Sequence, residues 1–278
     1  MDQPLPPGLY IVATPIGNLG DITARAADTL CRVDRILAED KRVTAKLLAQ
    51  LGAKAPMTAY HDHSDDALRD RIVAELSAKS IALVSDAGTP LISDPGYKLV
   101  RAARAAGAEV HTLPGPCAAI AALTLAGLPT DRFLFLGFLS TKAKARSETI
   151  AEVAELRASL VLYESGPRLG ESLAALADRL GTRDAAVIRE ISKLHEECVT
   201  GSVSELAARY VDAQPRGEIV IVVGPPPERA EASDDQLDAA LDEALARLSP
   251  SRAAAEVATS LGIPRKRAYA RALERSVS

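Results

Sequence analysis

Two Ser-Asp-x-Gly units follow one short apolar run, which occupies residues 81–84, and the units themselves occupy residues 85–88 and 93–96. The apolar run is too short for a helix and predicts a strand, and the glycines and prolines behind it predict a loop. Open α/β sheets bind ligands at the carboxyl ends of their strands, where such loops supply carboxylates and bare backbone. The alternative is two Asx turns and a helix N-cap that bind no ligand.

Acidic and histidine side chains follow other apolar runs. Glu39 and Asp40 end one predicted strand, Glu164 ends another, and His61 and His63 lie in a polar loop. Such groups could accept a proton from a reacting hydroxyl. For Glu39 and Asp40 the alternative is a strand-end cap. Two histidines at this spacing without further ligands favour polar surface over a metal site, so we expect no metal.

Composition narrows the class of protein. The chain has 278 residues, enough for two domains, with 47% hydrophobic content and a net charge of −4. This charge argues against a protein that coats nucleic acid with its whole surface. The nearly apolar run at residues 117–128 is shorter than the roughly 20 residues that span a bilayer, and the first residues lack a signal-peptide pattern. We therefore expect a cytosolic protein, and its three distant cysteines should be free thiols.

Strand and helix patterns alternate, which predicts an α/β fold. The first part should contain strands at residues 9–13, 35–38, 81–84 and 109–113, and helices at 22–33, 65–78 and 97–106. Pro114-Gly115-Pro116 breaks the pattern, so we place one domain at residues 1–114 and a second at 115–224. The second should contain helices at 118–126, 148–157 and 168–180, and strands at 133–138, 160–164, 186–189 and 218–223.

The remaining chain divides into segments of opposite charge. Residues 225–240 hold three consecutive prolines and much of an acidic run, which favours a stiff, solvated linker. Residues 241–278 should form a helical basic tail, with a helix at 252–261, a turn at Gly262 and a second helix after Pro264, a helix-turn-helix pattern. A helical hairpin packed on the body of the protein is the alternative.

Two basic clusters could contact phosphates. One is a predicted flexible loop after the strand at 133–138, carrying Lys142, Lys144 and Arg146. Surface solvation explains this loop equally well. The other opens the second helix of the tail, with Arg265, Lys266 and Arg267.

A series of motifs, in order, carries a family resemblance. The motifs are YIVATPIGNLGDIT at residues 10–23, AEDKR at 38–42, HDH at 61–63, LVSDAGTPLISDPGY at 83–97, LPGPCAAI at 113–120, GLPTDRFLFLGFL at 127–139, YES at 163–165 and GEIVIVV at 217–223. With this series the chain resembles, over nearly its whole length, the tetrapyrrole methylase-like superfamily of S-adenosylmethionine-dependent methyltransferases. Lys41 and residues 165–168 depart from that pattern. A dinucleotide-binding reading is weak, because no G-x-G-x-x-G follows the first strand.

The resemblance implies a class III methyltransferase-like fold, with two α/β domains and the S-adenosylmethionine cleft between them. It also implies which residues contact this cofactor: Ile16, Gly17, Asp86, Gly88, Thr89, Cys117, Ala118, Tyr163 and Glu164. The superfamily branch that it matches acts on small-subunit (16S) ribosomal RNA, at the ribose 2′-hydroxyl of a cytidine, and usually forms homodimers.

For that reaction the proton acceptor would be one of Glu39, Asp40, His61, His63 and Glu164. Ribosomal RNA, free or in the 30S subunit, would contact Arg42, Lys142, Lys144, Arg146, Arg168, Arg265, Lys266 and Arg267. One alternative is a porphyrinoid methylase, which the basic tail disfavours because a small tetrapyrrole needs no phosphate contacts. The other is an RNA-binding module without catalysis.

Overall fold

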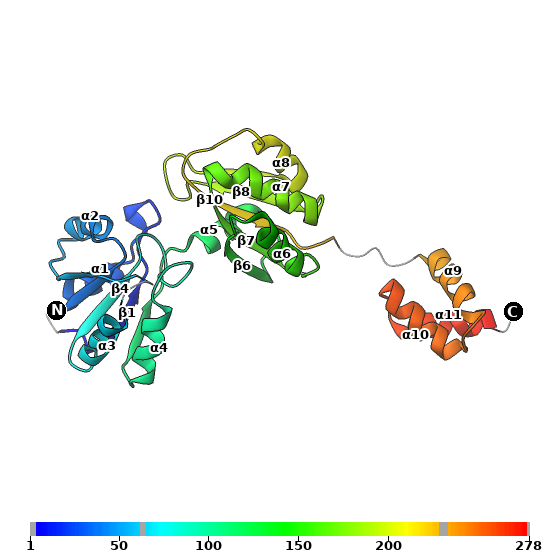
Figure 1. Ribbon diagram of the computed structural model, residues 1–278, viewed down its shortest axis with the longest axis horizontal. Helices are drawn as coiled ribbons and strands as arrows, with labels where there is room; N and C mark the ends of the chain where they lie inside the picture. The colour runs from blue at the N-terminus through cyan, green and yellow to red at the C-terminus, as the bar shows by residue number, and fades with distance from the viewer. Residues whose placement is uncertain (1–3, 62–64, 228–232, 277–278) are drawn as a thin grey trace. The chain divides into compact units, whose positions relative to one another are not determined.

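The computed structural model describes residues 4–61, 65–227 and 233–276 (Figure 1). Contacts divide the chain into two compact units, Met1–Pro226 and Pro227–Ser278. The larger unit contains two five-stranded sheets and the smaller unit is helical. In the part of the chain that the structure describes, no helix combines the length and the apolar character that a membrane crossing requires.

The first sheet is parallel throughout. In spatial order its strands are β3 (Met57–Ala59), β2 (Arg35–Ala38), β4 (Ser80–Val84), β1 (Gly8–Val12) and β5 (Val110–Leu113). Every residue of β1 and β4 is buried, which explains their nearly unbroken apolar sequences. One face packs against α1 (Ala24–Arg32) and α2 (Lys41–Leu51), and the other against α3 (Asp66–Glu75) and α4 (Tyr97–Ala105).

The second sheet is mixed, with β6 parallel to β7 and the other pairs antiparallel. In spatial order its strands are β6 (Phe133–Phe138), β7 (Ser159–Ser165), β10 (Glu218–Val223), β8 (Asp184–Arg189) and β9 (Glu197–Ser202). One face packs on α5 (Ala118–Ala126), and the other on α6 (Ala143–Val153), α7 (Leu169–Leu180) and α8 (Val203–Tyr210).

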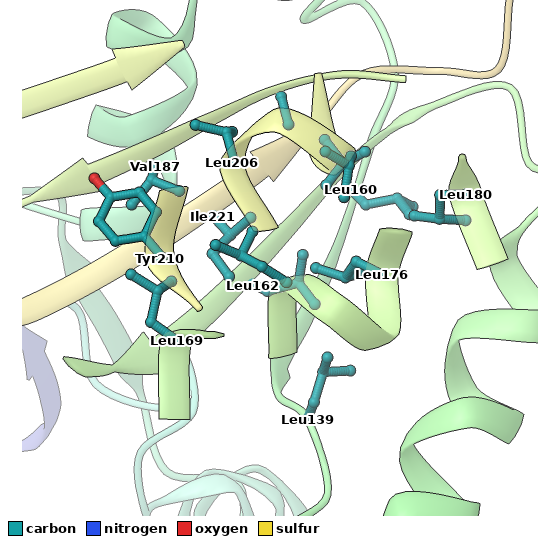
Figure 2. Close-up of a cluster of buried hydrophobic side chains, with 14 of the residues drawn as sticks. Leu139, Leu160, Leu162, Leu169, Leu176, Leu180, Val187, Leu206, Tyr210 and Ile221 are labelled. Carbon is teal, nitrogen blue, oxygen red and sulfur yellow. The ribbon is translucent and has the colours of Figure 1, made fainter. Parts of the chain in front are cut away.

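The apolar side chains of β7 point alternately to the two faces of this sheet and contribute to the hydrophobic core on each face. Leu160 and Leu162 join the cluster that contains the leucines of α7, and Figure 2 shows Leu162 beside Ile221. Val161, between them in sequence, joins the cluster beneath α5. The period of two residues thus places successive apolar side chains on opposite faces.

The smaller unit consists, in its described part, of α9 (Asp234–Leu245), α10 (Pro250–Leu261) and α11 (Arg265–Ser276). Alanines and leucines of all three helices share one apolar cluster. Gly262 ends α10 in the left-handed conformation, at the predicted turn. A capping box of Ser233 and Gln236 begins α9, so a helix occupies residues 234–240, where the sequence favoured a linker.

Several predicted boundaries shift. The helix expected at 22–33 begins at Ala24 behind the N-cap Thr23, because Leu19–Asp21 form a 3-10 turn. The helix expected at 148–157 is α6, which starts five residues earlier, at Ala143, and ends at Val153. The apolar patterns of the sequence did not predict α2, β3, β9 or α8. The predicted boundary at residue 114 falls between β5 and α5 and stays a prediction.

Candidate active site

The loop behind β4 is joined to the end of β1. These strands are parallel neighbours, so their carboxyl ends meet. The backbones of Thr14 and Gly88 exchange two hydrogen bonds, with N···O distances of 2.8 and 3.0 Å. Gly88 has a φ of +77°, and a Cβ there would lie 3.2 Å from Cγ2 of Ile16. The loop therefore needs glycine, both for its conformation and for this close approach.

The second half of the loop stores backbone strain. Leu91 and Ser93 have φ values of 75° and 64°, which non-glycine residues rarely adopt. The β-bulge of β6 lies nearby, since a Cβ on Gly137 would stand 3.1 Å from the Ser93 Oγ. Strain of this kind persists only where the surroundings enforce it, as they commonly do at functional sites. Asp94 directly follows Ser93 in this constrained segment.

We call the part of the larger unit that contains the parallel sheet its first half, and the part that contains the mixed sheet its second half. The two halves enclose a pocket of about 290 Å³, which we call the cleft pocket. The first half contributes Ile16, Glu39 and loop positions 86–89 and 92–94. The second half contributes Cys117, Ala118, Phe138, Tyr163, Glu164, Ile191 and positions 218–220. Its volume lies near the lower end of the roughly 300–1,000 Å³ of small-molecule sites.

The cleft pocket gathers eight of the nine residues that the resemblance assigned to the cofactor: Ile16, Asp86, Gly88, Thr89, Cys117, Ala118, Tyr163 and Glu164. Gly17 is outside the lining. A Cβ on Gly17 would collide with the Lys193 side chain, so this glycine instead permits contact between the two halves. Thr89 also links the halves, because its hydroxyl donates to the Pro116 carbonyl at 2.9 Å.

Asp40 does not line the cleft pocket. Its side chain is the N-cap of α2 and accepts from the Arg42 backbone N–H at 2.8 Å. Hydrogen bonds from the Arg42 guanidinium and backbone lower the pKa of Asp40 to about 2. A carboxylate that holds its proton so weakly is a poor base at neutral pH. The geometry thus supports the capping interpretation for Asp40, whereas Glu39 does line the pocket.

Glu164 is buried and held by several donors. Its carboxylate accepts from the Ser172 hydroxyl at 2.5 Å and from the Ser165 backbone N–H at 2.8 Å. The Arg168 Nε lies 3.5 Å away. Donors of the protein itself therefore already occupy several acceptor positions of this carboxylate.

Tyr163 supplies an aromatic wall beside Glu164. Its hydroxyl accepts from the Ala119 N–H at 3.2 Å, and burial raises the pKa of this phenol. The rings of Phe135 and Phe138 meet it edge to face, at centroid distances of 4.8 and 5.7 Å. Phe138 is 56% exposed, so this wall continues toward solvent.

Asp94 and Asp86 carry the acidic groups of the two Ser-Asp-x-Gly units, and both line the cleft pocket. Asp86 accepts from the Asp40 N–H at 2.9 Å. Burial raises the pKa of Asp94 to about 6, a hydrogen bond with Ser85 opposes the rise, and the charges of Glu39 and Asp86 add to it. Sequence reasoning selected Asp86 and missed Asp94, although the repeated unit was a signal that could have found it.

Of the two histidine candidates, His61 does not join this site. His61 is exposed and absent from the lining of the cleft pocket. His63 lies outside the described residues. Among the residues that the structure does describe, no three His, Cys, Asp or Glu side chains come together as metal ligands would.

The basic cluster after β6 differs from the prediction. It is not a flexible loop, because α6 begins directly behind Lys142. Lys144 is exposed, but Arg146 is only 4% exposed and pairs with Glu171 at 2.5 Å. The i, i+2 spacing on a helix turns these side chains to different faces. Arg146 therefore makes its contacts within the larger unit and does not face solvent.

Two further arginines assigned to RNA are already paired. The guanidinium of Arg42 is 2.6 Å from the Asp40 carboxylate, although its side chain is 90% exposed. Arg168 donates to the Leu139 carbonyl at 2.5 Å besides approaching Glu164.

In the smaller unit, α9 and α11 form a ladder of ion pairs. Arg267 pairs with Asp234 at 2.8 Å, Arg271 with Asp238 at 2.6 Å, and Arg275 with Asp242. The acidic and basic segments thus neutralise each other along one side of α11. Arg265 and Lys266 are exposed at the beginning of this helix.

Comparison with known proteins gives two family matches. Residues 8–207 match the family of Tetrapyrrole (Corrin/Porphyrin) Methylases, and residues 231–276 match the RsmI C-terminal HTH domain. A solved uroporphyrin-III-C-methyltransferase from Thermus thermophilus superposes with a TM-score of 0.56 at 22% identity, covering 78% of this chain and 93% of that one. This likeness confirms the predicted fold class.

Curated relatives extend the match to nearly the full length. A protein from Erythrobacter litoralis is 57% identical over 98% of this chain and 96% of its own length. One from Mesorhizobium japonicum is 45% identical over 98% of this chain and 93% of its own length. Both carry the name ribosomal RNA small subunit methyltransferase I. The chain therefore belongs to the tetrapyrrole methylase family of methyltransferases, in the branch that carries the RsmI C-terminal domain.

Proposed function

We propose that this protein transfers a methyl group from S-adenosylmethionine to the ribose 2′-hydroxyl of a cytidine in 16S ribosomal RNA. The observation that carries the substrate class is the 57% identity, over 98% of the chain, to a protein named ribosomal RNA small subunit methyltransferase I. The cytidine and the 2′-hydroxyl come from the motif resemblance. The cleft pocket and the helical smaller unit are compatible with a small cofactor and an RNA substrate.

The residues of the cleft pocket fit this cofactor. Gly88 leaves open the space that a Cβ would fill beside Ile16, so backbone groups can approach a ligand closely. The pocket carboxylates Glu39 and Asp86 favour a cation such as a sulfonium. When bound, S-adenosylmethionine supplies an electrophilic methyl group.

The protein's share of the reaction is chiefly positioning. An in-line displacement needs the nucleophilic oxygen held about 3–3.5 Å from the methyl carbon, with water excluded. The loop behind β4 is held for this task by the hydrogen bonds between the backbones of Gly88 and Thr14. The half-exposed ring of Phe138 adds an apolar surface at the solvent side of the Tyr163 wall.

RNA contacts should come from exposed cations that have no ion pair among the described residues, or only a long one such as the 3.8 Å pair of Lys144 with Glu148. We propose Arg265 and Lys266 in the smaller unit, and Lys142 and Lys144 at the beginning of α6, as the principal phosphate contacts. Arg267, Arg42 and Arg168 could add contacts if their present pairs open. We further propose a cytoplasmic homodimer that acts on free ribosomal RNA or on the 30S subunit.

The deciding experiment uses 30S subunits from cells that lack this protein. Purified protein and methyl-labelled S-adenosylmethionine should label their 16S RNA, and mass spectrometry of nuclease fragments should place the methyl group on a cytidine ribose. Labelling of a base would overturn the 2′-hydroxyl assignment. Absence of labelling in both 30S subunits and free 16S RNA would overturn the proposed function.

Two parallel assays address the alternatives. Transfer to uroporphyrinogen instead of RNA would identify a porphyrinoid methylase. RNA binding without heat release on titration with S-adenosylmethionine would identify a non-catalytic module. Light scattering behind a sizing column tests the homodimer, which predicts twice the mass of one 278-residue chain.

A further inference from the structure

The candidates for the proton acceptor are unequal once their contacts are known. Asp40 is a helix cap bound to Arg42, and Glu164 is held by Ser165 and Ser172. His61 does not line the cleft pocket. Asp94, which belongs to the second Ser-Asp-x-Gly unit but was not among the candidates chosen from the sequence, lines it together with Glu39.

Asp94 has the surroundings of a reactive carboxyl group. It is half-buried, it lies between the strained Ser93 and Gly96, and the bulge of β6 approaches Ser93 from the second half of the larger unit. Its position is therefore set by both halves. Burial chiefly raises the pKa of the Tyr163 phenol in the second half, and the charge of Asp94 adds a small contribution to this rise.

We infer that Asp94 is the general base that accepts the proton of the attacking hydroxyl, an inference that rests on the proposed function. It lies in the pocket, in contact with Ser85 and near the carboxyl groups of Glu39 and Asp86. Those two negative charges would also strengthen a neighbouring group's hold on a proton.

The step is balanced in atoms and charge. The ribose O–H bond breaks and its proton passes to a carboxylate oxygen of Asp94. The oxygen forms a bond to the methyl carbon while the carbon–sulfur bond breaks, and the electron pair of that bond remains on sulfur. The products are a methyl ether, a neutral thioether and a protonated Asp94, which then returns its proton to water.

The acidity of Asp94 suits this role. A general base is most effective when its pKa lies close to the working pH. Burial, with the charges of Glu39 and Asp86 and against the hydrogen bond of Ser85, brings the pKa of Asp94 to about 6. At pH 7 the group is then mostly ionised and still binds a proton far better than Asp40, whose pKa is about 2.

The test compares Asp94→Asn with wild type in single-turnover methyl transfer to 30S subunits. We expect the rate to fall by roughly 10²- to 10⁴-fold. The wild-type pH profile of kcat/KM should show an acidic limb near pH 6 that the variant lacks. Calorimetric affinity for S-adenosylmethionine should change by less than about threefold, since the group acts on the hydroxyl.

Two further variants sharpen the assignment. Glu39→Gln removes a negative charge that faces Asp94, so the acidic limb should move to lower pH without disappearing. Asp131→Asn, at an exposed loop position, should leave rate and profile as in wild type. In the free protein, carbon NMR of labelled aspartates should show one carboxyl titrating near pH 6 that is missing in Asp94→Asn.

The outcomes separate this inference from the proposed function. Labelling by wild type together with an unchanged rate and acidic limb in Asp94→Asn would overturn the role of Asp94 alone. Loss of cofactor affinity by tenfold or more with the acidic limb retained would make Asp94 a binding residue and also overturn it. Absence of labelling by wild type would overturn the proposed function, and the inference with it.

Discussion

Two carboxyl groups line the cleft pocket from different halves of the larger unit, and their surroundings differ in kind. Glu164, at the end of β7, is buried with hydrogen bonds from Ser172 and Ser165 and an arginine nearby. Asp94, in the loop behind β4, is half-buried beside two other carboxyl groups. Residue type and position in the pocket therefore do not determine the role of a carboxyl group. The partners of the group do.

The backbone segments that carry Glu164 and Asp94 also differ in how they are held. Glu164 belongs to an interior strand whose side chains pack into two apolar cores, one of which Figure 2 shows. Asp94 belongs to a loop with positive φ values at Leu91 and Ser93. One wall of the pocket is thus stabilised by its own contacts, whereas the other is held in a strained conformation by its neighbours.

The largest expected effect is on stability, at Glu164. Replacement by alanine leaves Ser172, the Ser165 N–H and Arg168 with lost partners, so we expect unfolding free energy to fall by about 3 kcal/mol. Urea denaturation measures this loss. As a control, Glu148→Ala removes an exposed carboxylate that lies 3.8 Å from Lys144, and should cost less than about 0.5 kcal/mol. Equal losses would contradict the structural role of Glu164.

The next effect is on ligand binding, at Gly88. A valine side chain there would press on Ile16 at the pocket lining, so affinity for S-adenosylmethionine should fall at least about tenfold, or 1.4 kcal/mol. Gly107→Val is the matched control, because Gly107 has a similar φ of +74° with no neighbouring atom within 4 Å. Both variants carry the same backbone strain, and only the first should weaken calorimetric binding. Unchanged affinity in folded Gly88→Val would place the cofactor elsewhere.

A smaller effect distinguishes Asp94 by its pH dependence. The rise of its pKa from 3.8 to about 6 corresponds to at most about 3 kcal/mol, and partial solvent screening reduces the expected value to about 1 kcal/mol. Above pH 6 the ionised group destabilises the folded state, and below about 3.8 it is protonated in both states. Asp94→Asn should therefore be more stable than wild type at pH 8, by an amount that shrinks as the pH falls through 6.

Paired urea titrations of wild type and Asp94→Asn at pH 8 and pH 5 measure this difference. The opposite signs expected at pH 8, a gain for Asp94→Asn and a loss for Glu164→Ala, express the contrast between the two walls directly. A stability loss for Asp94→Asn at pH 8 would show that this carboxylate is paired in the folded protein.

Local sequence patterns predicted the strands that build the pocket, because buried parallel strands need apolar runs and their ends need polar loops. The same patterns located the loop behind β4 and the helix-turn-helix of the tail. They also predicted free thiols, and the three cysteines are free.

Sequence patterns could not predict ion pairs and hydrogen bonds between residues that lie far apart in the chain. Arg146 looked like part of a solvated basic loop until its partner Glu171, on α7, was known. Asp40 and Glu164 looked like equivalent bases until their donors were known. Nothing in the local sequence indicates that the acidic segment before residue 243 pairs with arginines 33 residues further along.

The smallest expected effect extends the same lesson to the smaller unit. Arg271 is bound to Asp238 in the ladder, whereas Lys266, among the described residues, takes part in no ion pair. Replacing Arg265 and Lys266 together by glutamine should reduce the slope of log K against log salt for 16S RNA by roughly 0.7 to 0.9 per lost phosphate contact, because fewer counterions are released. Affinity for S-adenosylmethionine should not change.

Arg271→Gln is the matched control. It removes a positive charge from the same helix but should leave the salt slope unaltered, since that charge already has a partner. Equal reductions in the two variants would mean that net charge, and not unpaired cations, governs RNA binding. A wild-type slope in the double variant would make this tail a structural element only.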